Sequence, residues 1–203
     1  MLEGLDGAGT TTQAGLLDAY FRSTDVEAWL TFEPTDHPIG TMIREGLSGD
    51  LESPSQGKIT LSETALCLLF AADRVEHSHD IEERRKMDKH VVSDRYVLSS
   101  IAYQSLAPQV SAERVIEVNR GIAVPDVTFL LDVPVDECLA RLDKRSDSPT
   151  VYEKKDILNR IAQNYEATLD LYVKSFGPVV RIDGTGTVDA VHKAIVEHVT
   201  KTI

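Results

Sequence analysis

The residues with the clearest chemical signature lie near the start of the chain. Residues 4–11 read Gly-Leu-Asp-Gly-Ala-Gly-Thr-Thr, which matches the phosphate-binding pattern G-x-x-x-x-G-K-[ST] except that Thr10 replaces the lysine. The glycines of such a loop let backbone N–H groups approach phosphate oxygens at the N-terminus of a helix. We therefore expect a phosphate site here, with the hydroxyl of Thr11 available to Mg²⁺. The alternative for eight residues with one mismatch is a glycine-rich turn without a ligand.

The missing lysine raises the main chemical question of this sequence. A lysine at this place adds a mobile positive charge on the β- and γ-phosphates, and Thr10 cannot supply that charge. The backbone N–H groups remain, so we expect phosphate binding to persist. Loss of one preorganised transition-state donor typically slows a reaction about 10²–10³-fold, so we expect slower phosphoryl transfer.

Two further groups of polar residues follow apolar runs that are typical of strands. Asp94 and Arg95 come directly after residues 90–93, and Glu33-Pro34-Thr35 follows residues 28–32. The carboxyl ends of parallel strands form the ligand-binding edge of an open α/β sheet. A carboxylate there can hold Mg²⁺, and a guanidinium can bind phosphate through two parallel hydrogen bonds. The alternative for Asp94 and Arg95 is a strand-end salt bridge.

The composition limits the partners and the compartment. The chain has 203 residues and a formal net charge of -12 at pH 7, which argues against a nucleic-acid partner because such domains carry a basic face. The longest apolar run, residues 65–72, is too short to span a bilayer, and a glycine loop stands where a signal peptide would lie. Cys67 and Cys138 lie in apolar helical patterns, which predicts reduced, buried thiols. We therefore expect a cytoplasmic protein without a membrane partner.

Strand-like and helix-like segments alternate along the chain, which predicts a parallel α/β sheet in a single domain, residues 1–203. The expected strands are residues 28–32, 90–93, 127–132 and 179–182, and the expected helices are residues 10–22, 61–87, 97–122 with an interruption at Pro108, 135–145, 156–176 and 188–200, with another beginning near Pro38. The strand before the glycine loop should be central, although only Met1, Leu2 and Glu3 remain of it. Buried strands usually have about five residues, so we expect a trimmed or misassigned start.

Several motifs resemble the thymidylate kinase family in order and spacing, over nearly the whole chain. The motifs are residues 4–13, Glu33-Pro34-Thr35 with Arg44, residues 69–74, residues 94–104 beginning Asp-Arg-Tyr, Pro125-Asp126, Leu131-Asp132-Val133-Pro134 and residues 153–165. Glu33-Pro34-Thr35 is similar to archaeal members in particular. The resemblance implies a P-loop kinase fold with a five-stranded parallel sheet and helices on both faces. It also implies a phosphate loop at residues 4–11 and a short mobile lid at about residues 141–154.

The same resemblance implies transfer of the γ-phosphoryl group of ATP to dTMP, which gives dTDP for dTTP biosynthesis, with Mg²⁺ as cofactor. The residues implied to bind ATP are Gly4, Leu5, Asp6, Gly7, Ala8, Gly9, Thr10, Thr11 and Thr12. Those implied to bind the acceptor are Asp6, Glu33, Arg44, Phe70, Arg74, Arg95, Ser100 and Tyr103. The implied catalytic residues are Asp94, Arg95, Arg141 and Arg145, and the implied metal ligands are Thr11 and Asp94.

Individual roles also follow from the resemblance. Phe70 would stack on the thymine ring and Arg74 would donate to its carbonyl, four residues apart on one helix face. Arg44 and Arg95 would bind the acceptor monophosphate, and Tyr103 would crowd a ribose 2′-hydroxyl. The alternatives are core packing for Phe70 and a solvated helix position for Arg44.

The predicted lid carries the cations that the loop lacks. Arg141, Lys144 and Arg145 precede a Ser-Asp-Ser-Pro break. Some family members have a basic residue inside the phosphate loop and others have arginine in the lid, and Ala8 places this chain with the second kind. A lid cation would stabilise the charge that develops on the β- and γ-phosphates. The alternative is that these cations only offset the dipole at a helix C-terminus.

Two departures keep other functions open. Thr10 and Phe32 each replace a basic residue that many members have near phosphate. The protein could therefore be a catalytically impaired nucleotide-binding protein of the same fold, with the nucleotide as a regulatory ligand. A kinase for another deoxynucleoside monophosphate is a third hypothesis, and Thr10 as an engineered substitution is a fourth.

The family commonly forms homodimers through packed helices. The apolar first half of the 61–87 helix is a candidate for that contact, although the same residues could be monomer core. His77 and His79 face different directions on that helix, so we predict no zinc site.

Overall fold

A parallel five-stranded sheet, in the strand order β2-β5-β1-β6-β7, forms the centre of the protein in a computed structural model that describes residues 1–144 and 152–202. The strands are β1 (Leu2–Gly4), β2 (Ala28–Phe32), β5 (His90–Asp94), β6 (Thr128–Asp132) and β7 (Val179–Asp183). β2, β5, β6 and β7 each begin and end within one residue of a strand predicted from the sequence. They pair in parallel, which confirms the predicted parallel α/β fold. Because all strands are parallel, their carboxyl ends meet at one edge.

The shortest strand of this sheet, β1, lies in its middle, as predicted. All of its residues pair with β6, from Leu2 opposite Phe129 to Gly4 opposite Leu131. Only Leu2 also pairs with β5, where it lies opposite Asp94. The glycine loop therefore leaves the sheet between the ends of β5 and β6, at the carboxyl edge.

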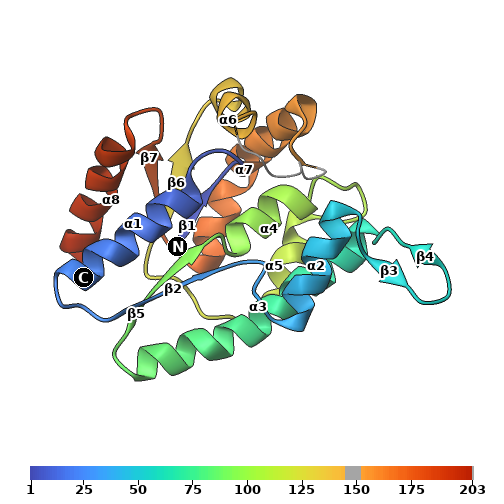
Figure 1. Cartoon of the computed structure of the whole chain (residues 1–203), viewed down its shortest axis with the longest axis horizontal. Coiled ribbons are helices and arrows are strands. Elements are labelled where there is room, and N and C mark those ends of the chain that lie inside the picture. The colour runs from blue at the N-terminus through green and yellow to red at the C-terminus, as the bar shows by residue number, and fades with distance from the viewer. Residues whose placement is uncertain (145–151, 203) are drawn as a thin grey trace.

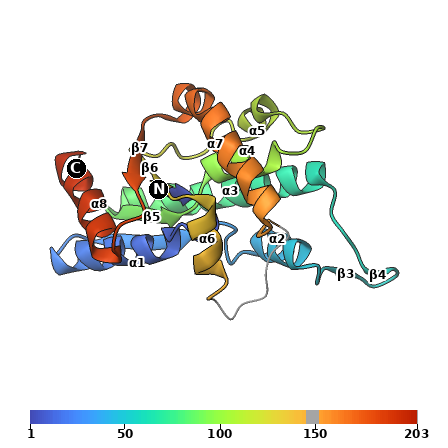
Figure 2. The same ribbon diagram turned by 90° about the horizontal axis from the view of Figure 1, so that it is seen from above.

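Helices cover both faces of the sheet (Figure 1), and the view from above separates them into two layers (Figure 2). One face carries α1 (Thr10–Ser23) and α8 (Val188–Thr202), and the other carries α3 (Glu63–Lys86), α4 (Val97–Gln104) and α7 (Lys155–Phe176). Three shorter helices, α2 (Pro38–Ser48), α5 (Ala112–Val118) and α6 (Val135–Leu142), pack against α3, α4 and α7 respectively.

Local sequence explains where several helices begin. The hydroxyl of Ser62 accepts a hydrogen bond from the backbone N–H of Ala65 and caps α3. Ser111 caps α5 in the same way, by accepting from the backbone N–H of Arg114. α2 begins at Pro38, whose fixed φ angle suits the first position of a helix.

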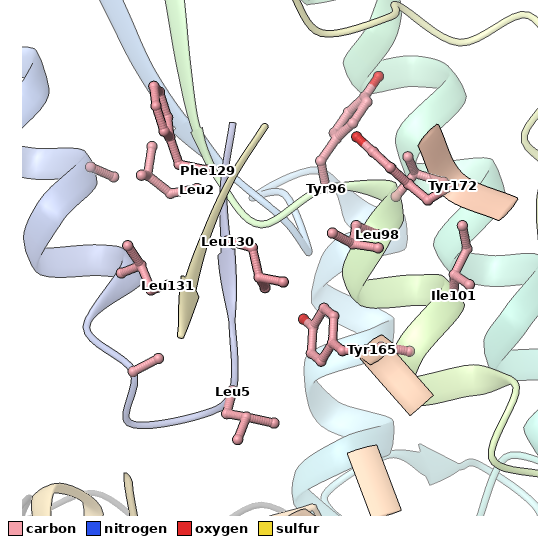
Figure 3. Close-up of a cluster of buried hydrophobic side chains, with 14 of the residues drawn as sticks. Leu2, Leu5, Tyr96, Leu98, Ile101, Phe129, Leu130, Leu131, Tyr165 and Tyr172 are labelled. Carbon is pink, nitrogen blue, oxygen red and sulfur yellow. The ribbon is translucent and has the colours of Figure 1, made fainter. Parts of the chain in front are cut away.

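The core lies on both sides of β6, because successive strand residues point to opposite faces. In Figure 3, Phe129 and Leu131 lie on the α1 side of the sheet, whereas Leu130 points towards α4. All three side chains are buried, and Leu98 and Ile101 of α4 lie on the same side of the sheet as Leu130. The core therefore fixes α1 and α4, two of the helices that begin at the carboxyl edge of the sheet.

The structure differs from the sequence prediction in three places. A hairpin of two-residue strands, β3 (Glu52–Ser53) and β4 (Gly57–Lys58), stands out from the body of the protein (Figure 1) and has no apolar alternation that would predict it. The interruption expected at Pro108 within residues 97–122 is confirmed, but it extends over residues 105–111 and separates α4 from α5. The expected helix over residues 135–145 ends at Leu142.

Candidate active site

The glycine loop between β1 and α1 has a backbone that only glycine adopts easily. Gly7 and Gly9 have φ angles of +85° and +97°, in the left-handed region. A Cβ on Gly7 would also lie 2.5 Å from the carbonyl oxygen of Cys138. The loop leads directly into α1, whose first backbone N–H groups have no partner within the helix. This arrangement suits a phosphate group, and Thr10, at the start of α1, is buried below the loop surface.

Thr11 and Asp94 lie side by side at the carboxyl edge. The hydroxyl of Thr11 donates to Asp94 Oδ2 over 2.5 Å, while the buried Oδ1 of Asp94 has no hydrogen-bond partner. A buried carboxylate oxygen without a partner suits a cation, and hydroxyl and carboxylate oxygens are the ligands that Mg²⁺ prefers. The structure thus brings together the two residues that the sequence suggested as metal ligands. Within residues 1–144 and 152–202, no group of three or more His, Cys, Asp or Glu side chains could hold a metal ion.

Arg95 is held at the end of β5 by groups from three segments. Its Nη1 donates to the carbonyl oxygen of Gly4 over 2.7 Å and to the hydroxyl of Ser99 over 3.0 Å, and its Nη2 donates to Asp6 Oδ1 over 2.5 Å. The guanidinium also lies over the ring of Tyr103, 5.3 Å from its centre. The φ angle of Arg95 is +68°, which is uncommon for a residue other than glycine. This conformation aims the guanidinium at the glycine loop rather than at solvent.

A cavity of about 310 Å³ opens beside this arginine. All eight residues that the sequence suggested for acceptor binding line it: Asp6, Glu33, Arg44, Phe70, Arg74, Arg95, Ser100 and Tyr103. They come from five separate segments, and the parallel sheet places those segments at one edge. Burial raises the pKa of Tyr103 well above its usual value, so its phenol is neutral and accepts from the backbone N–H of Asp6. The cavity therefore combines aromatic walls with three arginines, which suits an aromatic ligand that carries negative charge.

Arg74 lies fully buried in the wall of the cavity, with a hydrogen bond from each of its nitrogens. Nε donates to Glu33 Oε2 over 2.8 Å, Nη1 to Asn119 Oδ1 over 2.7 Å and Nη2 to Ser100 Oγ over 2.8 Å. His77 holds the second oxygen of Glu33 over 2.9 Å and contacts Thr31 behind it. Glu33 therefore lines the cavity but directs its carboxylate to Arg74 and His77.

The turn after β2 is fixed by two charged residues. Arg44 Nη1 donates to the carbonyl oxygens of Pro34 and Thr35 over 2.7 and 2.6 Å. Asp73 accepts from the backbone N–H and the hydroxyl of the same Thr35. α2 approaches this turn so closely that a Cβ on Gly40 would lie 2.0 Å from the carbonyl oxygen of Thr35. Arg44 is thus an ordered, half-exposed part of the cavity wall, and not a freely solvated helix residue.

Gln104 and Asn119 are among the residues of this site that sequence reasoning missed. Gln104 is 2% exposed and lines the cavity, and its Oε1 has no hydrogen-bond partner. Asn119 is also buried and orients Arg74, while its amide donates to the carbonyl oxygen of Val115. Gln104 closes the motif that begins at Asp94, which was the available signal. Asn119 lies at the end of α5, far along the chain from Arg74, so the sequence contained no signal that the two residues would meet.

The predicted lid is only partly within the described residues. Arg141 belongs to the last turn of α6, where it donates to the carbonyl oxygens of Ala8 and Gly184 over 3.2 and 2.8 Å and pairs with Glu137. It therefore lies against the glycine loop, close to where a lid cation was expected. Arg145 and the break after it fall outside the described residues.

Two further predictions concern the cysteines and membrane-spanning helices. Cys67 and Cys138 are both free and buried, as predicted, and burial raises the pKa of the Cys138 thiol to about 11. Among the helices of the described residues, none combines the length and the apolar character that a membrane span needs.

Comparison with known proteins agrees with this geometry. The thymidylate kinase family matches residues 2–195. The chain is 38% identical over 204 residues to a probable thymidylate kinase of Thermococcus onnurineus, which covers 98% of this chain and 96% of that protein. Probable thymidylate kinases of Methanococcus aeolicus and Thermococcus kodakarensis are 36% and 38% identical, each covering 97% of this chain and 93% and 94% of the relative.

Proposed function

The chain belongs to the thymidylate kinase family, and we propose that it transfers the γ-phosphoryl group of ATP to dTMP, giving dTDP for dTTP biosynthesis. The observation that carries this proposal is the cavity beside the glycine loop, which gathers all eight residues suggested for the acceptor. We propose residues 1–203 as one such domain, with its lid at about residues 141–154. The free, buried cysteines fit an enzyme of the cytoplasm, where thiols stay reduced.

The donor end of the site consists of the loop residues 4–12 with Thr11 and Asp94. The backbone N–H groups of the loop would hold the β- and γ-phosphates of ATP, and Thr11 with Asp94 would hold Mg²⁺. When bound, Mg²⁺ neutralises charge on the phosphates and helps to orient them. Arg141, whose guanidinium lies against Ala8, and Arg145 are the candidate cations that compensate for the missing loop lysine.

The acceptor end consists of the cavity. Phe70 would stack on the thymine ring, and Arg74 with Ser100 and Gln104 would meet the polar edge of the base. Arg95 and Arg44 would hold the monophosphate, because a guanidinium binds phosphate oxygens in pairs. Holding both substrates at one sheet edge places the acceptor oxygen beside the γ-phosphorus, which is the main task in phosphoryl transfer.

The deciding experiment is ATP-dependent conversion of dTMP to dTDP with Mg²⁺, with dCMP, dGMP and dUMP as comparison acceptors. Turnover selective for dTMP is the expected result. Tight binding of dTMP and ADP without turnover would instead identify a regulatory nucleotide-binding protein. Turnover with a different monophosphate would change the acceptor and keep the chemistry.

A substitution of Thr10 tests the role of this residue. Thr10→Lys restores a cation that reaches the β- and γ-phosphates, so turnover should rise by about 10²–10³-fold if this position limits transfer. Ala19→Lys, at an exposed position near the other end of the same helix, is the matched control and should leave turnover low. An unchanged rate in Thr10→Lys would show that the lid and loop already supply the charge needed.

We also propose a homodimer through α3. One stripe of α3 faces the core, and a second stripe, formed by Leu68, Ala72 and Val75, is exposed. Exposed apolar residues at this spacing suit helix packing against a second copy. Leu68→Glu should shift sedimentation from dimer to monomer, whereas Met87→Glu, an exposed apolar residue at the end of the same helix, should leave the dimer intact.

A further inference from the structure

The carboxylate of Glu3 is completely buried under the site, and no step of the proposed reaction uses it. Glu3 is the β1 residue before Gly4, and its side chain is 0% exposed. It does not line the acceptor cavity. A buried carboxylate that contacts neither substrate has a large desolvation cost, so its hydrogen bonds indicate what it does.

Within the described residues, the side-chain hydrogen bonds of Glu3 all go to the first turn of α4. Oε1 accepts from the backbone N–H of Tyr96 over 2.9 Å and from that of Ser99 over 3.2 Å, and Oε2 accepts from the hydroxyl of Ser99. Tyr96 is the N-cap residue of α4, and its own side chain makes no capping hydrogen bond. Glu3, a residue of β1, therefore caps the N-terminus of α4. A negative charge at this end of a helix also suits the helix dipole.

Ser99 connects this cap to Arg95. Its hydroxyl donates to Glu3, which leaves its lone pairs to accept from Arg95 Nη1 over 3.0 Å. Arg95 is also tied to β1 directly, because its backbone N–H donates to the carbonyl oxygen of Leu2 and its Nη1 donates to that of Gly4. The guanidinium thus has a fixed direction before any ligand arrives.

We propose that Glu3 is a positioning residue that, through Ser99, holds the Arg95 guanidinium in the direction needed to bind the 5′-phosphate of the acceptor nucleotide. This inference rests on the proposed function in that it assumes a nucleoside monophosphate in the cavity. It predicts that weakening the Glu3–Ser99 link affects recognition of the phosphate and not recognition of the base.

The test compares binding of dTMP with binding of thymidine by titration calorimetry, because the two ligands differ only in the phosphate. The variants are Ser99→Ala, which removes the relay and keeps the backbone cap, Glu3→Gln, which removes the charge at constant shape, and their combination. The relay is a charge-assisted hydrogen-bond chain, so each single variant should weaken dTMP binding about tenfold and leave thymidine binding unchanged. The double variant should bind dTMP no more weakly than either single variant, because both substitutions break the same link.

Ser105→Ala, at the other end of α4, is the matched control and should bind both ligands like the parent protein. Equal weakening of dTMP and thymidine binding, additive losses in the combination, or unchanged dTMP binding in Ser99→Ala would each overturn the inference. If Glu3→Gln does not fold, Glu3→Asp takes its place: it keeps the carboxylate but shortens its reach to Ser99, so it should weaken dTMP binding and leave thymidine binding unchanged. Absence of dTMP turnover with retained dTMP binding would overturn the proposed function and leave this comparison intact.

Discussion

Two of the three arginines that line the cavity, Arg74 and Arg95, are built into the protein in different ways. The Arg74 side chain is 1% exposed, and its nitrogens donate to Glu33, Asn119 and Ser100. The Arg95 side chain is 19% exposed and pairs with Asp6, which is itself 21% exposed. Nε of Arg95 makes no hydrogen bond to the described part of the chain, so this arginine keeps donor capacity for a ligand.

The difference separates two tasks. We call Glu33, Arg74, Ser100 and Asn119 the base region, and Asp6, Arg95 and Ser99 the phosphate region. In the base region the charge of Arg74 is balanced by Glu33 inside the protein, which suits a ligand ring without charge. The residues that would recognise the base therefore also stabilise the fold. In the phosphate region the pairing is partly hydrated and incomplete, which suits a ligand that brings its own negative charge. Substitutions should therefore cost stability in the first region and activity in the second.

The largest effect is expected when each arginine loses its carboxylate partner. Glu33→Ala leaves Arg74 buried and unpaired, so the free energy of unfolding should fall by about 3–5 kcal/mol. Asp6→Ala is the matched change in the phosphate region, and it should cost less, because the pair is partly hydrated and Arg95 keeps its hydrogen bonds to Gly4 and Ser99. Urea denaturation followed by circular dichroism measures both values. Equal losses in the two variants would remove the distinction between the regions.

The next effect concerns turnover. Arg95→Met removes the cation that we assign to the phosphate, so kcat/KM for dTMP should fall roughly 10²–10³-fold while stability changes by about 1 kcal/mol or less. Arg114→Met is the control, because Arg114 forms an exposed ion pair with Glu117 outside the site. A variant of Arg95 that unfolds as readily as Glu33→Ala would contradict the comparison.

How well the sequence predicts these regions depends on how far apart in the sequence the interacting residues lie. The apolar residues of β2, β5, β6 and β7 carry their own signal, which is strongest in β6, where the first four residues are apolar or Thr and all are buried. The hairpin formed by β3 and β4 has two-residue strands and carries none. The central position of β1 was predicted from the loop that follows it and not from its own length.

The phosphate region was easier to predict than the base region. Asp94 and Arg95 adjoin a strand end, so their place at the ligand edge followed from the chain itself. The pairing of Arg74 with Glu33 joins a helix to a strand end 41 residues away, and the contact with Asn119 joins two helices 45 residues apart. Such contacts depend on how helices pack on the sheet, which periodicity alone does not specify.

A third effect should appear as a pH dependence of stability in the phosphate region. Burial raises the pKa of Glu3 from 4.5 to about 7, although hydrogen bonds from Ser99 and the nearby Arg95 act in the opposite direction. Between these values the folded protein holds a proton that the unfolded chain has lost, so stability should fall as the pH rises from about 4.5 to 7, by roughly 3 kcal/mol in total.

Glu3→Gln should remove most of that pH dependence, as measured by thermal unfolding at a series of pH values. Glu113→Gln is the control, because Glu113 is exposed and its pKa is lowered by its own backbone N–H and by Ser111, so it titrates below the window. The expectation fails if Glu3→Gln and the parent protein lose stability with the same slope.

The smallest effect is expected from Ser100→Ala in the base region. Ser100 accepts from Arg74 Nη2, so its hydroxyl hydrogen is available to a carbonyl oxygen of the base. Loss of one neutral hydrogen bond is worth about 0.5–1.5 kcal/mol, so kcat/KM for dTMP should fall about three- to tenfold, with a similar small loss of stability. Ser78→Ala removes a buried serine that contacts Tyr96 and Ala123 and should lower stability without changing kcat/KM. A change of kcat/KM as large as that of Arg95→Met would place the base region, and not the phosphate region, at the centre of the chemistry.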